Sequence, residues 1–250
     1  MKIAIITGGS RGIGKSAALN VAKRGNGVIL TWNSHSEEAE AVVAEIKKNG
    51  GKAVALKLDV TQTAGFNDFA SLIEQTLQKE WNQKTFDYLV NNAGTAQRTL
   101  IKDTTEEQFD QLTQVHFKGP FFLTQKLIPL MADGGHIINI STGLSRFTNL
   151  AGVATYASLK GAMEVFTRYL AAEYAPRRIR ANTVAPGAID TNFAGPNKRS
   201  DEQKKMIASH TALGRCGEAE DIGLLIAALL SEDSRWVNAQ RIEASGGMHI

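Results

Sequence analysis

The sequence predicts an α/β protein with a doubly wound parallel sheet of about seven strands and helices on both faces. Short β-branched segments alternate with longer segments of helical periodicity along all 250 residues. Several of the short segments are apolar on both faces, as in a parallel sheet that helices cover on each side. The expected strands span residues 2–7, 27–32, 52–60, 87–92, 135–141, 178–185 and 240–245.

Three of the expected helices are the clearest. The first follows Ser34, with Glu37 three residues later as a candidate capping box and apolar residues recurring on one face. The second begins near Thr104 or Thr105, with Glu107 as a possible capping partner, and runs to Met131, with Pro120 bending or interrupting it. The third covers about residues 154–175.

Composition indicates a globular protein that forms one domain over residues 1–250. Apolar residues make up 43% of the chain and charged residues 21%, and no repeat, low-complexity tract or linker divides it. The apolar run at 222–230 is too short for a membrane span, and the amino terminus lacks the pattern of a secretory signal. The single cysteine, Cys216, excludes an internal disulfide and fits a reducing compartment, so a cytoplasmic location is expected.

Charge and histidine distribution argue against two other classes of partner. The net charge is +3, and basic residues are spread among acidic ones, so nucleic-acid binding is not indicated. The five histidines show no metal-ligand spacing, and no metal site is predicted.

The loop after the first strand carries the first chemical signal. Residues 7–15 read TGGSRGIGK, which spaces Gly8, Gly12 and Gly14 as G-x-x-x-G-x-G. Such a turn lets the N–H groups at a helix amino terminus approach a pyrophosphate. A glycine turn could also serve only to connect strand and helix, but its place after the first strand favours dinucleotide binding.

The end of the second strand indicates which dinucleotide. A free ribose 2′-hydroxyl is usually held there by Asp or Glu. This chain has Asn33 and Ser34 instead, and Arg11 lies within the glycine turn and could pair with a 2′-phosphate. These residues favour NADP(H) over NAD(H), although Asn33 and Ser34 are also suited to a turn and a cap.

Further motifs follow in a characteristic order. They are LDV at 58–60, NNAG at 91–94, ST at 141–142, Tyr156-x-x-x-Lys160, APG at 185–187 and ASGG at 244–247. With the glycine turn they make the whole chain resemble the short-chain dehydrogenase/reductase family, including members similar to 3-oxoacyl-ACP reductases and glucose dehydrogenases. The resemblance implies a single Rossmann-type domain that moves a hydride between NAD(P)(H) and an alcohol or carbonyl carbon. It also implies a homodimer or homotetramer built on the helices at 104–131 and 154–175.

The same resemblance implies a set of cofactor-binding residues. They are Gly8, Ser10, Arg11, Gly12, Ile13, Gly14, Asn33, Ser34, Asp59, Val60, Asn91, Ala93, Gly94, Tyr156, Lys160, Pro186, Gly187, Ile189 and Thr191. Asp59 and Val60 would contact the adenine ring. Two of these residues also have structural roles open to them: Asp59 could cap the next helix, and Asn91 could tie neighbouring strands together.

Tyr156 and Lys160 form the candidate catalytic pair. Residues four apart lie on one helical face, so the phenol and the ammonium group can meet. At about 4 Å and an effective dielectric of about 20 their attraction is about 4 kcal/mol, which would lower the phenol pKa by up to about 3. Tyr156 would then act as general acid and base. The pattern alone is weak, because Tyr174 and Arg178 repeat it nearby.

Two departures from the family pattern leave site residues open. The family places Ser 13 residues before the Tyr, but here that position is Gly143. A one-residue insertion within 145–153 would make Thr142 the substrate-binding hydroxyl, with Ser141 as the alternative. His116 stands where the family usually has an Asn that helps to hold a proton-relay water. It is either part of such a relay, where its titration would add a second pH dependence, or a packed side chain.

The substrate is left open at this stage. Residues 192–210 are expected to form a mobile lid, and Arg98, Arg146 and Phe147 are candidates for the pocket mouth. Oxoacyl thioesters, sugars, steroids and small ketones all remain candidate substrates. The alternative function is an inactive regulatory protein that binds NADPH.

Overall fold

The computed structural model describes residues 1–148, 150–194 and 199–249. Its centre is one parallel sheet of seven strands in the order β3-β2-β1-β4-β5-β6-β7, which confirms the predicted fold class. The strands are β1 (Ile3–Ile6), β2 (Gly27–Trp32), β3 (Ala53–Lys57), β4 (Phe86–Asn91), β5 (Met131–Ile140), β6 (Arg180–Pro186) and β7 (Arg241–Ala244). All seven predicted strand positions are confirmed.

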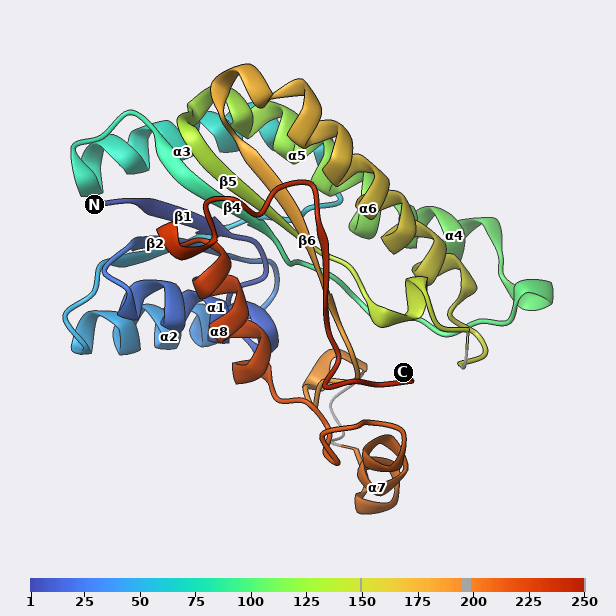
Figure 1. The fold of residues 1–250 in the computed structure, drawn as a ribbon. Helices are drawn as coiled ribbons and strands as arrows, with labels where there is room; N and C mark the ends of the chain where they lie inside the picture. Colours follow the sequence, from blue (N-terminus) through green and yellow to red (C-terminus); the bar gives the residue numbers. More distant parts are fainter. Residues whose placement is uncertain (149, 195–198, 250) are drawn as a thin grey trace.

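Helices cover both faces of the sheet, as Figure 1 shows: α1, α2 and α8 on one face, and α3, α5 and α6 on the other. An apolar core fills the space between the sheet and each layer of helices. The helices are α1 (Gly12–Lys23), α2 (Ser36–Lys48), α3 (Phe66–Trp81), α4 (Glu106–Thr113), α5 (Gly119–Leu127), α6 (Ala154–Glu173), α7 (Asp201–Ser209) and α8 (Ala219–Leu229). Within the described residues, none of the helices is both long and apolar enough to cross a membrane.

The strand order reverses direction at β1. This strand pairs with β2 on one side and with β4 on the other. The loops that leave the carboxyl ends of β1 and β4 therefore run to opposite faces and open a crevice between them. Helix α7 lies beyond this edge, near the carboxyl-terminal segment (Figure 1), and backbone hydrogen bonds of 3.0–3.1 Å join residues 212–213 to Gly246 and Gly247.

Two helix predictions need correction. Helix α2 begins at Ser36 with His35 before it and no side-chain cap, so the capping box of Ser34 and Glu37 is wrong. Ser34 lies too far outside the first turn for its hydroxyl to reach the free N–H groups. In α4, Thr105 forms a capping box with Gln108, so the expectation that Glu107 is the capping partner is wrong.

The long helix expected up to Met131 is interrupted, as predicted, but before Pro120. A π-helical turn at Gln114–Lys118 separates α4 from α5, and Pro120 occupies the first turn of α5, where it needs no N–H partner. Gly119 is required at this junction because a Cβ there would lie 2.1 Å from the Val60 carbonyl oxygen. The π-helical turn contains His116, which lines the cavity described below.

Candidate active site

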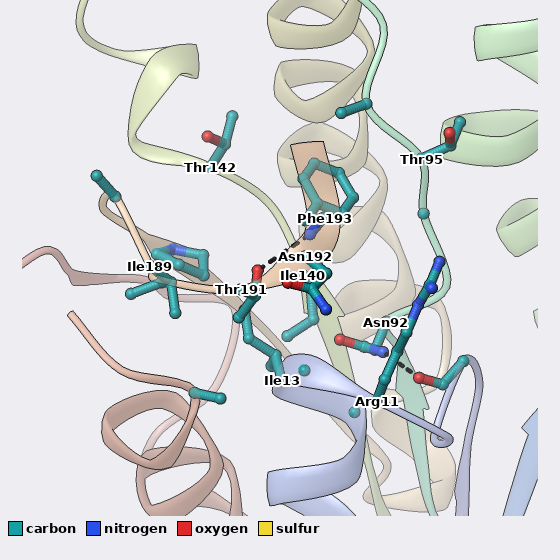
Figure 2. A pocket seen from close by; sticks show the side chains of 18 of the residues that line it. Arg11, Ile13, Asn92, Thr95, Ile140, Thr142, Ile189, Thr191, Asn192 and Phe193 are labelled. Atoms are coloured by element: carbon teal, nitrogen blue, oxygen red, sulfur yellow. Dashed lines mark hydrogen bonds between the residues drawn. The ribbon is translucent and has the colours of Figure 1, made fainter. Parts of the chain in front are cut away.

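A cavity of about 1300 Å³ lies at the carboxyl edge of the sheet and brings together almost every predicted site residue. Predicted residues that line it are Gly8, Ser10, Arg11, Gly12, Ile13, Gly14, Asn33, Ser34, Asp59, Val60, Ala93, Gly94, His116, Ser141, Thr142, Tyr156, Lys160, Pro186, Gly187, Ile189 and Thr191. Figure 2 shows how Arg11 and Ile13 of the glycine turn face the same space as Thr142 and Thr191. The segments are distant in sequence and meet because parallel strands end at one edge.

Asn91 is the exception, and the expectation that it lines the cavity is wrong. Its side-chain amide donates to Thr124 Oγ1 at 3.0 Å and to Asn139 Oδ1 at 2.8 Å, beneath the cavity and within the core. The next residue, Asn92, lines the cavity instead and donates to the carbonyl oxygens of Thr7 and Gly8 at 2.9 and 3.1 Å. Strand alternation sends neighbouring side chains to opposite faces, which is the signal that distinguishes the two asparagines.

The glycine turn has the geometry that a dinucleotide pyrophosphate requires. Gly8 and Gly12 have φ values of +64° and +56°, which disfavour any side chain. A Cβ on Gly14 would lie 2.1 Å from the Gly8 carbonyl oxygen. Arg11 precedes α1 without capping it, so the N–H groups of the first turn remain available to an anion. The residues present therefore fit a dinucleotide at this end of the cavity.

The adenosine end carries no carboxylate directly after β2. Trp32, Asn33, Ser34 and His35 line the cavity there, together with Arg11 of the glycine turn. Asp59 also lines this end, but it accepts hydrogen bonds from the N–H and the hydroxyl of Thr61 at 2.9 and 2.7 Å. Its local turn-forming role and a contact with the adenine ring are compatible.

Lys160 and Tyr156 project from α6 into the other half of the cavity. Lys160 is 5% exposed and donates to the Ile140 carbonyl oxygen at 2.6 Å, and its Nζ lies 5.9 Å from the centroid of the Tyr156 ring. Burial lowers the pKa of Lys160 to about 8. At pH 7 the amine is therefore predominantly charged.

The pKa of Tyr156 corrects the sequence-based expectation. Burial raises this pKa to about 12, and the hydrogen bond with Thr142 opposes the rise only in part. The expected fall in the phenol pKa caused by Lys160 is therefore wrong for the protein alone. The reason is geometric: the Lys160 ammonium hydrogen-bonds the end of β5 rather than the phenol oxygen.

The structure distinguishes the two candidate hydroxyls. Ser141 donates to Glu164 Oε1 at 2.6 Å, so its hydroxyl is already bonded within the protein. Thr142 Oγ1 accepts a hydrogen bond from the Leu144 N–H at 3.3 Å, which leaves its proton free, and the Thr142 hydroxyl lies close enough to the Tyr156 phenol to lower the phenol pKa. Of the two, Thr142 is the hydroxyl available to a group bound beside the phenol.

His116 packs its ring edge-on against Tyr156 at a centroid separation of 5.0 Å. It is 1% exposed, and burial together with the charge of Lys160 lowers its pKa to about 3. The neutral ring donates from Nε2 to the Thr95 carbonyl oxygen at 2.9 Å, and Nδ1 finds no protein partner among the described residues. The expectation that titration of His116 adds a second pH dependence to the reaction rate near neutral pH is therefore wrong.

The remaining part of the cavity is bordered by polar side chains, among them Gln97, Gln203 and His210, and by a larger set of apolar and aromatic ones. The apolar and aromatic side chains are Phe147, Leu150, Val153, Phe193, Met206, Ile207 and Met248. Arg98 reaches the cavity as expected, whereas Arg146 does not line it and pairs with Glu243 at 3.4 Å. The expected lid contributes Phe193 and residues of α7, and its positions 195–198 lie outside the described residues.

Such a cavity is typical of oxidoreductases that use a dinucleotide, because it combines a turn suited to a pyrophosphate with a phenol and a hydroxyl that can donate protons. Within the described residues, no three His, Cys, Asp or Glu side chains form a group able to hold a metal ion. Residues 8–249 match the family model described as Enoyl-(Acyl carrier protein) reductase. The chain belongs to the short-chain dehydrogenase/reductase family and is an oxidoreductase.

Individual relatives agree with this assignment. The chain is 34% identical to the hydroxynaphthalene reductase-like protein Arp2 of Metarhizium brunneum, over 98% of this chain and 94% of that protein. It superposes with a TM-score of 0.92 on the angucycline C-6 ketoreductase LanV with bound NADP, at 33% identity, covering 99% and 95% of the two chains. A short-chain dehydrogenase/reductase from Serratia marcescens gives a TM-score of 0.91 at 28% identity, covering 100% and 98%. None of these findings favours the inactive regulatory alternative.

Thr142→Val should lower kcat for carbonyl reduction by about 10²-fold, because it removes a hydroxyl beside the reacting oxygen while keeping the side-chain shape. Thr142→Ser should retain most of the activity. Steady-state rates of NADPH consumption measure both variants. Equal rates for Thr142→Val and the unmodified protein would contradict the assignment of Thr142.

Lys160 should make the free energy of unfolding depend on pH between about 8 and 10.5. Its folded-state pKa, about 8, lies below the ordinary 10.5, so the unfolded chain binds more protons in that interval and stability rises with pH. Relative to Lys160→Met, the unmodified protein should gain up to about 3 kcal/mol between pH 7.5 and 10.5.

Urea denaturation at a series of pH values measures this difference. Lys79→Met, at an exposed lysine of α3, is the matched control. Parallel stability curves for the unmodified protein and Lys160→Met would show that burial does not perturb this amine.

Proposed function

We propose that the protein reduces a carbonyl group with NADPH and that Tyr156 supplies the proton. One observation carries this proposal: Tyr156, Thr142 and the glycine turn line one cavity. When bound, NADPH supplies a hydride to the carbonyl carbon. Addition of one proton to the carbonyl oxygen then completes the alcohol product.

Each residue has a distinct role in this proposal. Tyr156 donates its phenolic proton to the carbonyl oxygen, and Thr142 donates a hydrogen bond to the same oxygen. A phenol with a pKa of about 12 is protonated at pH 7, which suits the reductive direction. The charged Lys160 stabilises the phenolate that is left after the transfer. His116 stays neutral, packs against the phenol ring and offers Nδ1 as an acceptor to a water or to the bound cofactor.

The preference for NADP(H) over NAD(H) is part of the proposal. Arg11, Asn33 and Ser34 would surround a 2′-phosphate at a strand end without a carboxylate, and a guanidinium group pairs well with phosphate. The NADP in the LanV structure supports this preference by analogy.

For the substrate we propose a ketone on a planar, mainly apolar ring system. Phe147 and Phe193 border the cavity, and the centroids of the Phe193 and Tyr156 rings lie 6.2 Å apart. Aromatic side chains pair favourably with flat rings. The names of the relatives, a hydroxynaphthalene reductase-like protein and an angucycline ketoreductase, support the same class.

We also propose a homo-oligomer and a location in a reducing compartment such as the cytoplasm. Exposed apolar side chains gather on α4, α5 and α6, among them Phe109, Phe122, Val165 and Tyr169 at 49%, 37%, 45% and 63% exposure. Association of two copies would remove this surface from water. Light scattering on the purified protein measures the oligomeric state, and a monomer at micromolar concentration would contradict this part.

Tyr156→Phe tests the chemistry. It should lower kcat with a fused-ring aryl ketone by at least about 10³-fold, because the proton donor is lost, while the Kd for NADPH changes by less than about twofold. NADPH absorbance gives the rate, and NADPH fluorescence gives the Kd. Tyr169→Phe, at an exposed tyrosine of the same helix, is the matched control. If Tyr156→Phe turned over normally, the proposed function would be refuted.

Arg11→Ala tests the cofactor preference. It should raise the Kd for NADPH by about tenfold and leave the Kd for NADH nearly unchanged, because only NADPH carries the 2′-phosphate. Arg24→Ala, at the other end of α1 and outside the cavity, is the control. A similar loss for both nucleotides would place Arg11 elsewhere along the cofactor.

A further inference from the structure

A group of three charged side chains lies behind the loop that carries Thr142. It consists of Glu164 on α6 and Arg241 and Glu243 on β7, and is called the Glu164 cluster below. The side chains are 15%, 19% and 19% exposed, so water screens them less than it screens surface pairs. None of the three lines the catalytic cavity.

Glu164 joins the catalytic helix to the loop. Its Oε1 atom accepts hydrogen bonds from the hydroxyls of Ser141 and Ser145 at 2.6 and 2.7 Å. Both serines lie in the loop. The same oxygen accepts a third hydrogen bond from Arg241 Nε at 2.8 Å. One carboxylate oxygen therefore holds the start and the end of the segment 141–145.

Arg241 extends this connection to the Thr142 backbone. Its Nη2 donates to the Thr142 carbonyl oxygen at 3.2 Å and lies 3.4 Å from the Ser145 hydroxyl, while Nη1 donates to Glu243 Oε2 at 2.8 Å. A guanidinium group is suited to such a role because its donors are fixed in one plane. The Ser145 hydroxyl also lies 2.8 Å from the Thr142 carbonyl oxygen.

Glu164 lies on the same side of α6 as the catalytic residues. Tyr156, Lys160 and Glu164 follow one another at intervals of four residues, which places them along one face of the helix. The hydroxyl of Thr142 meets the phenol of Tyr156 near one end of this face. The Glu164 cluster therefore ties the Thr142 loop to the helix that carries Tyr156.

We propose that Arg241 and Glu164 are positioning residues for carbonyl reduction, which hold the Thr142 hydroxyl at the distance from Tyr156 that the reaction needs. This inference rests on the proposed function. The two residues act through the loop, since they do not reach the cavity. A displacement of about 1 Å in a reacting group costs about 10²-fold in rate, so losing this connection should lower kcat strongly.

A double-mutant cycle tests the inference. Arg241→Met should lower kcat by about 10-fold to 100-fold and leave the Kd for NADPH within about twofold of normal. In the Thr142→Val background the same change should cost less than about threefold, because the hydroxyl that Arg241 positions is already absent. A merely structural role would give the same factor in both backgrounds.

Two further variants keep the test decisive. Arg241→Lys keeps the charge without the planar donors and should recover only part of the lost rate. Glu164→Gln replaces Arg241→Met in the cycle if the latter does not fold. Arg215→Met is the control, because Arg215 makes a similar two-donor pair with Asp221, at 2.6 and 2.7 Å, outside the catalytic cavity.

The outcomes separate the two proposals. The positioning role would be overturned if Arg241→Met lowered kcat by the same factor with and without Thr142→Val, or if the Thr142→Val protein were as active as the unmodified one. Neither result would contradict the proposed reductase function. Failure of the unmodified protein to oxidise NADPH with any fused-ring ketone would overturn the proposed function, and the positioning role with it.

Discussion

The placement of the Thr142 hydroxyl beside the Tyr156 phenol in one cavity is the arrangement on which the rest of the site depends. It joins the loop after β5 to α6, two segments that the fold brings together only because parallel strands end at one edge. Buried polar bonds below hold the two elements in place: Asn139 connects to Asn91 and to Thr167 of α6 at 2.8 Å each. Unpaired, these buried amides would destabilise the core, so their bonds favour a single arrangement of sheet and helix.

The site carries a cost in stability that is consistent with a catalytic role. Lys160 is almost fully buried and donates to the Ile140 carbonyl oxygen, and it has no carboxylate partner among the described residues, so its charge is poorly compensated and its pKa falls to about 8. A buried amine without a carboxylate partner would be selected against in a purely structural position. In the proposed reaction, the same uncompensated charge would stabilise the phenolate that forms when Tyr156 gives up its proton. Nearby, Glu164 and Glu243 neutralise Arg241, and this second charge is bonded to structure rather than directed at substrate.

The nucleotide half and the substrate half of the cavity are built on different principles. At the glycine turn the nucleotide half is built mainly from backbone: glycines at positive φ and the N–H groups that begin α1, with the Asn92 side-chain amide bracing the turn. The substrate half consists of side chains from the loop after β5, from the segment following β6 and from the carboxyl-terminal segment. Backbone geometry suits a cofactor common to many reactions, whereas side chains can vary with the substrate.

The sequence by itself determined the sheet, the glycine turn and the Tyr156–Lys160 spacing, because periodicity and glycine placement are local properties of the chain. Only the tertiary structure decided which of Ser141 and Thr142 faces the phenol, that Asn92 rather than Asn91 reaches the cavity, and that the phenol pKa is raised rather than lowered. Each of these depends on burial and on partners distant in sequence, such as Glu164 for Ser141 and Asn139 for Asn91. The Glu164 cluster could not be predicted from the sequence for the same reason. Arg241 and Glu243 lie 77 and 79 positions from Glu164, and they meet it because α6 packs against β6, which pairs with β7.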